Sequence, residues 1–269
     1  HPDVDLISFT GSCDVGRQIQ TAAGARLAKV CMELGGKNPL IVCDDADLGR
    51  AVVTAGLSAF SNAGQRCASG SRLIVFDGIY DRFKEQLLEY TRGLTLGSAD
   101  DDDLGPVINQ RQLDNMVAAV ARARQAGATV LIGGGRMADV AHRNGFFMMP
   151  TLLEGADASD EISRAELFGP IACLYRVSDF EEALALANTS PFGLTAAIHT
   201  ASVDRGMTFL SRIKSGVASI NGATYGSEPH MPFGGLRQSG TGWREAGTEA
   251  LDVYSDWKTI YINANPASV

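Results

Sequence analysis

Short apolar runs alternate with helix-type segments along most of this 269-residue chain. The apolar runs are bounded by glycine, proline or aspartate, as strands commonly are. Strands are expected at residues 4–10, 28–34, 39–43, 72–76, 129–132 and 217–220, with another around Ile198. Alternating strands and helices predict an α/β fold in which flanking helices cover a largely parallel sheet.

The helices expected between these strands are identified by their start signals and apolar spacing. They span about residues 15–25, 44–62, 80–90, 111–125, 178–188 and 203–213. Ser178 and Glu181 have the spacing of a capping box at the start of the fifth helix. Residues 4–25 therefore read as strand, glycine turn and helix, an arrangement that can offer backbone N–H groups to a phosphate.

The composition limits the possible partners. The chain is 45% hydrophobic and 20% charged, values typical of a soluble globular protein. Its net charge of −8 and pI near 5.0 disfavour nucleic acid and anionic membrane surfaces as partners. No apolar run approaches the roughly 18 residues of a membrane span.

The cysteines and histidines show no metal-binding pattern. The five cysteines are odd in number and lack C-x-x-C spacing, and the four histidines are scattered. We therefore expect no metal site and a reducing compartment, which favours the cytoplasm.

Two motifs contain a candidate nucleophile and a candidate base. Cys67 stands in Gly64-Gln65-Arg66-Cys67-Ala68-Ser69, where small neighbours leave room for a substrate. Glu33 precedes a glycine pair. A thiolate that attacks and a carboxylate that activates water would together perform covalent catalysis. Taken alone, each residue favours a structural interpretation, Cys67 as a buried packing residue and Glu33 as a surface charge.

Seven sequence features occur in an order that resembles the aldehyde dehydrogenase superfamily over nearly the whole chain. They are Phe9-Thr10-Gly11-Ser12, Met32-Glu33-Leu34-Gly35-Gly36-Lys37, Gly64-Gln65-Arg66-Cys67, Glu166-Leu167-Phe168-Gly169-Pro170, Pro191-Phe192-Gly193-Leu194, Asn221 and Pro232-Phe233-Gly234-Gly235. The resemblance implies NAD(P)-dependent oxidation of an aldehyde to a carboxylic acid. Cys67 would form a thiohemiacetal and then a thioester, and Glu33 would be the general base for its hydrolysis. The segment 244–253 is similar to bacterial ketoglutarate-semialdehyde dehydrogenases.

The resemblance also implies which residues bind NAD or NADP and which line the substrate pocket. The implied cofactor-binding residues are Thr10, Gly11, Ser12, Leu34, Gly35, Glu166 and Phe168. The implied pocket residues are Arg66, Ala68, Asn221, Phe233 and Glu245, with the stretch 222–231, including Tyr225, at the mouth of the aldehyde tunnel. Glu245 is read equally as a second acid near the thiol or as a partner in a structural ion pair.

Three parts are expected along the chain. Residues 1–36 would end a Rossmann-type NAD(P)-binding domain, residues 37–235 would form the catalytic thiol domain, and residues 236–269 would form a return segment with an oligomerisation strand. Because the chain starts at His1 and its motifs match the second half of the resembled family, we expect a fragment without the N-terminal half.

The expected oligomerisation strand lies at residues 257–262, which include Trp257 and Ile262. The resemblance implies a homodimer or homotetramer through this strand, and the alternative is an edge strand paired within its own chain. Two other functions stay open: a non-catalytic assembly fragment, and a coenzyme A-acylating aldehyde dehydrogenase. The intact Glu33 argues against the second, because a hydrolytic base is retained.

Overall fold

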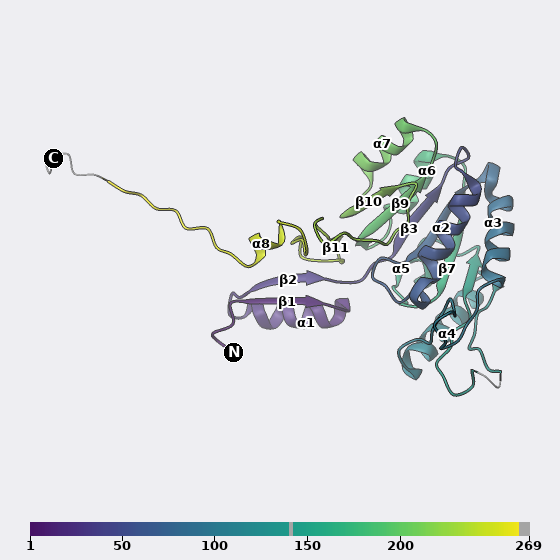
Figure 1. Ribbon diagram of the computed structural model, residues 1–269, viewed down its shortest axis with the longest axis horizontal. Helices are drawn as coiled ribbons and strands as arrows, with labels where there is room; N and C mark the ends of the chain where they lie inside the picture. The colour runs from purple at the N-terminus through teal and green to yellow at the C-terminus, as the bar shows by residue number, and fades with distance from the viewer. Residues whose placement is uncertain (140–141, 264–269) are drawn as a thin grey trace.

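The computed structural model describes residues 1–139 and 142–263. Its largest sheet has seven strands, and Figure 1 shows how the helices lie around it. The strand order is β10-β9-β3-β4-β7-β6-β5, and all neighbours are parallel except β5 and β6. The strands are β3 (Asn38–Val42), β4 (Gly70–Phe76), β5 (Thr129–Ile132), β6 (Thr151–Glu154), β7 (Ile171–Val177), β9 (Thr195–His199) and β10 (Val217–Ile220). The expected α/β fold with a largely parallel sheet is confirmed.

Helices cover both faces of this sheet. On one face α2 (Leu48–Phe60) and α3 (Asp77–Arg92) pack together over β4 and β7. On the other face α6 (Phe180–Ala187) packs over β3 and β4, and α7 (Val203–Arg212) packs over β10. Right-handed crossovers between parallel strands produce this division, because connections that run in opposite directions along the sheet lie on opposite faces.

The sheet is buried from both sides. Residues 40–42 of β3 and 73–75 of β4 have no exposed surface. A strand covered on both faces needs apolar residues at successive positions rather than at alternate ones, which explains these continuous apolar runs. At the far edge, α4 (Gln110–Gln125) packs against β5 and the short α5 (Glu161–Arg164).

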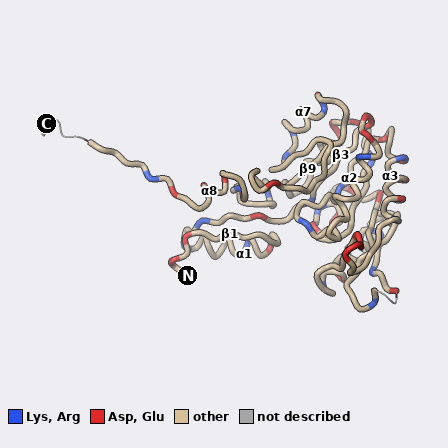
Figure 2. The backbone as a smooth tube through the Cα atoms, in the orientation of Figure 1, with Lys and Arg blue, Asp and Glu red and all other residues tan. Residues whose placement is uncertain are grey.

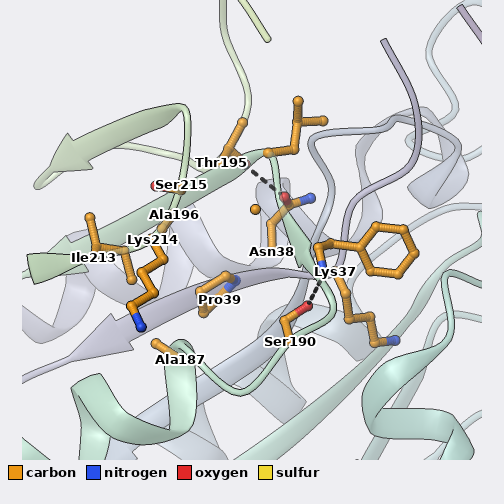
Figure 3. A pocket seen from close by; sticks show the side chains of 13 residues that line it. Lys37, Asn38, Pro39, Ala187, Ser190, Thr195, Ala196, Ile213, Lys214 and Ser215 are labelled. Carbon is orange, nitrogen blue, oxygen red and sulfur yellow. Dashed lines mark hydrogen bonds between the residues drawn. The ribbon is translucent and has the colours of Figure 1, made fainter. Parts of the chain in front are cut away.

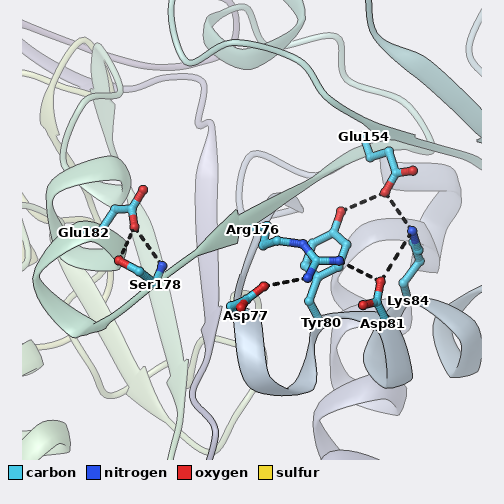
Figure 4. Close-up of polar contacts among 8 residues, drawn as sticks. All are labelled: Asp77, Tyr80, Asp81, Lys84, Glu154, Arg176, Ser178 and Glu182. Atoms are coloured by element: carbon cyan, nitrogen blue, oxygen red, sulfur yellow. Dashed lines mark hydrogen bonds and ion pairs between the residues drawn. The ribbon is translucent and has the colours of Figure 1, made fainter.

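A polar network fastens α3 to the neighbouring strands (Figure 4). Arg176 of β7 donates hydrogen bonds to Asp77 at 2.5 Å and to Asp81 at 2.6 Å, and its guanidinium lies 4.1 Å from the ring centroid of Tyr80. The Tyr80 hydroxyl donates to Glu154 of β6 at 3.0 Å. The ion pairs are partly exposed, so they orient α3 more than they stabilise it.

A second, two-stranded sheet lies beside the first (Figure 1). It pairs β1 (Leu6–Thr10) with β2 (Lys29–Glu33) in parallel, connected through α1 (Cys13–Gly24). Its small core, formed by Ala23, Val30, Met32 and Leu34, is separate from the main core. The arrangement is a strand–helix–strand unit, and the expected domain boundaries at residues 36 and 235 stay predictions.

The chain returns from the large sheet toward β2. The strand β11 (Leu236–Arg237) pairs antiparallel with β8 (Phe192–Gly193), and Gly240 then forms a bridge with Glu33. A last helical turn, α8 (Ala250–Val253), follows. The return segment therefore lies against the end of β2 and helps to fix Glu33.

The expected strand at residues 257–262 is not formed within this chain. The segment is extended without strand pairing, and Figure 1 shows it leading away from the body. Trp257 is 96% exposed and Tyr261 is 87% exposed. The alternative of an edge strand paired within its own chain is therefore wrong, because a strand requires a hydrogen-bonded neighbour and this segment has none among the described residues. Residues 264–269 of the expected last part lie outside the described residues.

The cap of α6 differs from the expected capping box by one residue. Asp179 is the N-cap, and its carboxylate accepts from the Glu182 N–H at 2.9 Å. Glu182 reaches back to the Ser178 N–H and hydroxyl, both at 2.7 Å (Figure 4). The box is therefore Asp179 with Glu182, because the charged Asp179 carboxylate is a stronger acceptor than the Ser178 hydroxyl.

Charged side chains are spread along the chain rather than gathered on one element. Figure 2 shows Lys and Arg scattered among Asp and Glu over the large sheet and its helices. Among the described residues, no helix is both long and apolar enough to cross a membrane.

Arg72 of β4 is a fully buried cation without a carboxylate partner in the described structure. Its guanidinium donates to the carbonyl of Leu186 at 2.8 Å, to the carbonyl of Ala187 at 3.3 Å and to the Thr189 hydroxyl at 3.0 Å. These acceptors lie at the end of α6, where unpaired carbonyls and the helix dipole favour a positive charge. Arg72 thus joins α6 to the centre of the sheet.

We expect Arg72→Met to lower the free energy of unfolding by about 3 kcal/mol, because buried acceptors at the end of α6 lose their donor. Urea denaturation followed by circular dichroism measures the change. Arg82→Met, on the exposed side of α3, is the matched control and should change the value by less than about 0.5 kcal/mol. Equal effects of the two substitutions would contradict the assigned role.

Candidate functional site

A cavity of about 900 Å³ lies where the two sheets meet. The carboxyl ends of β1 and β2 face the segments that precede β4 and β7 across this cavity. Its lining residues are Thr10, Gly11, Ser12, Glu33, Leu34, Gly35, Gln65, Arg66, Cys67, Ala68, Ile108, Gln112, Glu166, Phe168, Tyr225, Gly226, Ser227 and Phe233. A concave site of this size with few charged groups suits a small ligand.

The structure brings most of the sequence-predicted site residues together in this lining. Those that meet there are Glu33, Cys67, Thr10, Gly11, Ser12, Leu34, Gly35, Glu166, Phe168, Arg66, Ala68 and Phe233. Tyr225, which the resemblance places at the mouth of an aldehyde tunnel, also lines this cavity. Asn221 and Glu245 are the two predicted pocket residues that do not line the cavity.

Asn221 is used elsewhere in the fold. Its carboxamide accepts from the Thr200 N–H at 3.0 Å and donates to the Thr200 carbonyl at 2.9 Å. The residue has a φ of 54°, a left-handed conformation that asparagine tolerates better than most residues. The expectation of a pocket-wall residue is therefore corrected: Asn221 connects the ends of β9 and β10.

Glu245 lies in an adjacent cavity of about 240 Å³, which Thr10 and Cys31 also line. Its carboxylate accepts from the Ser8 hydroxyl at 3.5 Å, and its backbone bridges to Phe233. Glu245 has no ion pair among the described residues, so the structural ion-pair interpretation is not supported. Its charge still acts on the site, because it contributes to the raised pKa of Glu33.

The loop that carries Cys67 has an unusual backbone. It begins with a short 3-10 segment, η1 (Ser61–Gly64), in which Asn62, Ala63 and Gly64 have φ values of 55°, 50° and 65°. Left-handed conformations at non-glycine residues cost about 1–3 kcal/mol each, so the surroundings must hold them. The Gln65 carboxamide contributes by donating to the Pro106 carbonyl at 3.1 Å and accepting from the Ile108 N–H at 2.9 Å.

Asn38 holds the same loop from the start of β3. Its carboxamide nitrogen donates to the Cys67 carbonyl at 2.8 Å and to the Ser69 carbonyl at 2.9 Å. Its oxygen accepts from the Thr195 N–H at 3.0 Å, beside a cavity of about 10 Å³ (Figure 3). Sequence reasoning gave Asn38 no role; the only local signal was a polar residue directly before an apolar strand.

The glycine pair after Glu33 permits a close approach of three segments. A Cβ on Gly36 would lie 2.3 Å from the Cys67 carbonyl oxygen, and a Cβ on Gly35 would lie 2.0 Å from the Glu166 carboxylate. The Gly36 N–H donates to that carboxylate at 2.9 Å. Glycine at position 36 therefore lets the loop that follows the base touch the backbone of the nucleophile loop, and glycine at position 35 leaves room for the Glu166 carboxylate.

Glu33 is almost completely buried, with 3% of its surface exposed. Burial raises the pKa of its carboxyl to about 7, and the charges of Glu245 and Glu166 act in the same direction while a contact with Cys67 opposes them. Its Oε1 atom is buried and has no hydrogen-bond partner among the described residues. Glu33 is thus a carboxyl group with a pKa near neutrality and a free acceptor position, as general bases require.

Burial, together with the negative charge of Glu33, raises the pKa of the Cys67 thiol to about 12. The thiol is therefore protonated at neutral pH and needs a base to become nucleophilic. Glu33, which contacts it, can accept this proton or the proton of an attacking water. The Cys67 N–H, which has no acceptor among the described residues, can stabilise an oxyanion that forms on the carbon attacked by the thiol.

The turn between β1 and α1 brings the start of a helix to the cavity. Ser12 caps α1 by accepting from the Val15 N–H at 3.4 Å, and Thr10, Gly11 and Ser12 open onto the cavity. The start of a 12-residue helix is a favourable place for an anion. Glu166, whose pKa burial raises to about 7, lies across the cavity and can accept from hydroxyl groups of a ligand.

Comparisons with known proteins agree with these observations. A family model described as "Aldehyde dehydrogenase family" matches residues 1–260. Alpha-ketoglutaric semialdehyde dehydrogenase of Bacillus subtilis is 40% identical over 97% of this chain and 54% of its own length. Betaine aldehyde dehydrogenase of Brucella ovis is 42% identical over 95% of this chain and 53% of its own.

Solved structures show the same relationship. Betaine aldehyde dehydrogenase of Staphylococcus aureus, determined in complex with NAD+, has a TM-score of 0.92 and 35% sequence identity, and the match covers 94% of this chain and 50% of that one. The chain thus spans about half the length of the relatives that it matches.

We expect the alkylation of Cys67 by iodoacetamide to accelerate as pH rises through about 7, because only ionised Glu33 can accept the thiol proton. Glu33→Gln should slow this reaction at pH 8 by about 100-fold. Peptide mass spectrometry measures the rate at Cys67, and Cys13 in the same samples serves as the internal control. Identical pH profiles for parent and variant at Cys67 would show that Glu33 is not the base.

Proposed function

This chain belongs to the aldehyde dehydrogenase family, and on that basis we propose that it carries the thiol, the base and part of the cofactor site of an NAD(P)-dependent dehydrogenase that oxidises an aldehyde to a carboxylic acid. The observation that carries the proposal is that Glu33 and Cys67 line one cavity between two sheets, close enough for each to shift the pKa of the other. A buried thiol beside a carboxyl with a pKa near neutrality can perform both halves of the reaction.

In the first half, the Cys67 sulfur attacks the aldehyde carbon while Glu33 accepts the thiol proton. The Cys67 N–H stabilises the oxyanion of the resulting thiohemiacetal. NAD or NADP, when bound, supplies the hydride acceptor for the oxidation. The adduct becomes a thioester on Cys67. Glu33 then releases the thiol proton to solvent. In the second half, the ionised Glu33 takes a proton from water while the water oxygen attacks the thioester carbon. The bond between that carbon and the Cys67 sulfur breaks, the Cys67 thiolate regains a proton, and the carboxylic acid is released.

The cavity wall divides into two sets of residues with different proposed roles. Ser12, with Thr10 and Gly11, binds the pyrophosphate at the start of α1. Glu166 binds ribose hydroxyls, and Phe168 packs beside the nicotinamide, with Leu34 and Gly35 completing that wall. Arg66, Ala68 and Phe233 face the aldehyde. The position of all these residues around one cavity supports the division.

The relatives are named for aldehydes of different charge, alpha-ketoglutaric semialdehyde in one case and betaine aldehyde in others. An aldehyde of this small, polar class is the proposed substrate. All five cysteines are free, which supports a reducing cytoplasmic environment.

The test is aldehyde-dependent formation of NADH or NADPH, followed at 340 nm with this chain and with the full product of its gene. We expect Cys67→Ser to abolish the signal, and Glu33→Gln to slow steady-state turnover by about 100-fold or more. A signal that persists in Cys67→Ser would contradict the proposal. Faster turnover of the parent on adding coenzyme A would instead favour an acylating enzyme, and no signal from either protein would favour a non-catalytic assembly role.

We also propose that residues 256–262 pair with a second copy of the chain, giving a homodimer or homotetramer. The segment is extended, exposes Trp257, Ile260, Tyr261 and Ile262, and has no strand neighbour among the described residues. Extended segments with apolar side chains and unpaired backbone groups readily add to a sheet edge.

Removal of residues 256–269 should therefore convert an oligomer to a monomer, measured by size-exclusion chromatography with light scattering. Trp257→Ala alone should weaken association without abolishing it, because backbone pairing remains. An unchanged mass after the truncation would contradict this role of the tail.

A further inference from the structure

Arg66 is the single cationic residue in the lining of the cavity that holds Cys67. It directly precedes the nucleophile in the chain, and it is partly buried. The other charged lining residues are Glu33 and Glu166. The mechanism described above uses both of these carboxyl groups and places Arg66 facing the aldehyde without assigning a bond to its guanidinium.

The guanidinium of Arg66 has no anionic partner in the described structure. Its central carbon lies 4.6 Å from the ring centroid of Tyr225. No carboxylate lies within 4.0 Å of it among the described residues, and its side chain donates no hydrogen bond there. Arg122, Arg176 and Arg212, by contrast, each hold a carboxylate at 2.5 to 2.7 Å.

Gln65, which precedes Arg66, cannot bind a ligand in its place. The Gln65 carboxamide is occupied by the segment that contains Pro106 and Ile108, so it is not available to a ligand. Tyr225 stabilises a cation over its ring, yet a guanidinium stacked on a ring still directs its N–H groups outward in its own plane. Those N–H groups match the two oxygens of a carboxylate.

We propose that Arg66 binds a carboxylate on the substrate, so that the aldehyde oxidised at Cys67 is the semialdehyde of a dicarboxylic acid. This inference rests on the proposed aldehyde oxidation and narrows its substrate class. The aldehyde carbon lies at the Cys67 sulfur, and the distal carboxylate lies at the guanidinium supported by Tyr225. Arg66 is then a specificity-determining residue that selects anionic aldehydes over neutral ones.

The two carboxyl groups in the cavity do not oppose this arrangement strongly. Burial raises the pKa of both Glu33 and Glu166 to about 7, which reduces their negative charge near neutral pH. Glu166 is also directed toward the Gly36 N–H, which offsets part of its charge. Arg66 is therefore the residue in the lining that makes the cavity favour an anionic ligand over a cationic one.

The test compares 4-oxobutanoate with butanal, aldehydes of equal length that differ in the carboxylate, on the active form of the protein. We expect Arg66→Gln to lower the ratio of the two kcat/KM values by about 10- to 100-fold, the loss typical of a charge-assisted hydrogen bond. Arg66→Lys should retain part of the preference, because it keeps the charge but not the paired donors. Arg82→Gln removes one positive charge on α3 and should leave the ratio unchanged.

A ratio that does not change in Arg66→Gln would overturn the proposal, as would a rise in KM for the cofactor in place of the aldehyde. A second measurement remains valid if no aldehyde is oxidised: succinate should protect Cys67 of the parent, but not of Arg66→Gln, from iodoacetamide. Protection that depends on Arg66 without any oxidation would mean that the anion site is correct and the proposed reaction is wrong. Absence of protection in the parent would overturn the anion site itself.

Discussion

The site depends on the contact between the loop after β2 and the loop before β4. Gly36 lies against the Cys67 carbonyl, and Asn38, two residues later, donates to that same carbonyl and to the Ser69 carbonyl. One short segment thus positions the base at one end and holds the nucleophile loop at the other. Together with the Glu33–Gly240 bridge of the return segment, this contact fixes the small sheet that carries Glu33 relative to the large sheet behind Cys67.

The position of the cavity follows from the direction of the strands. Parallel strands place all their amino ends at one edge, so the segments before β3, β4 and β7 meet there. The small sheet presents its carboxyl ends, with Thr10 and Glu33, to that edge. The rigid apolar core behind β3 and β4 lets the loops in front adopt strained backbone angles, because the strand ends cannot move to relieve them.

The sequence predicted the features that depend on local pattern. The strands and helices near the cavity show a hydrophobic pattern in their own sequences. Cys67 and Glu33 each stand within a recognisable sequence motif. The roles of two asparagines depend on geometry that no local pattern encodes. Asn221, expected at the pocket wall, bonds to Thr200 from a left-handed backbone, and Asn38, for which no role is expected, donates to carbonyls about 30 residues away. The segment 257–262 has strand composition, but pairing requires a neighbouring strand, and none of the described residues pairs with it.

The buried state of Glu33 links the chemistry to the stability of the fold. The pKa of the Glu33 carboxyl rises from 4.5 to about 7 on folding. Its contribution to the stability of the folded state is complete below pH 4.5, where the carboxyl is protonated in both states. This contribution is lost as the pH rises through 7. Ionising it at higher pH therefore costs about 3 kcal/mol of stability, and the ionised form is the one that can act as a base. The continuous apolar core of β3 and β4 must offset that cost. The burial that raises the pKa of Glu33 and makes it a base thus depends on the stability that the fully buried strands β3 and β4 supply.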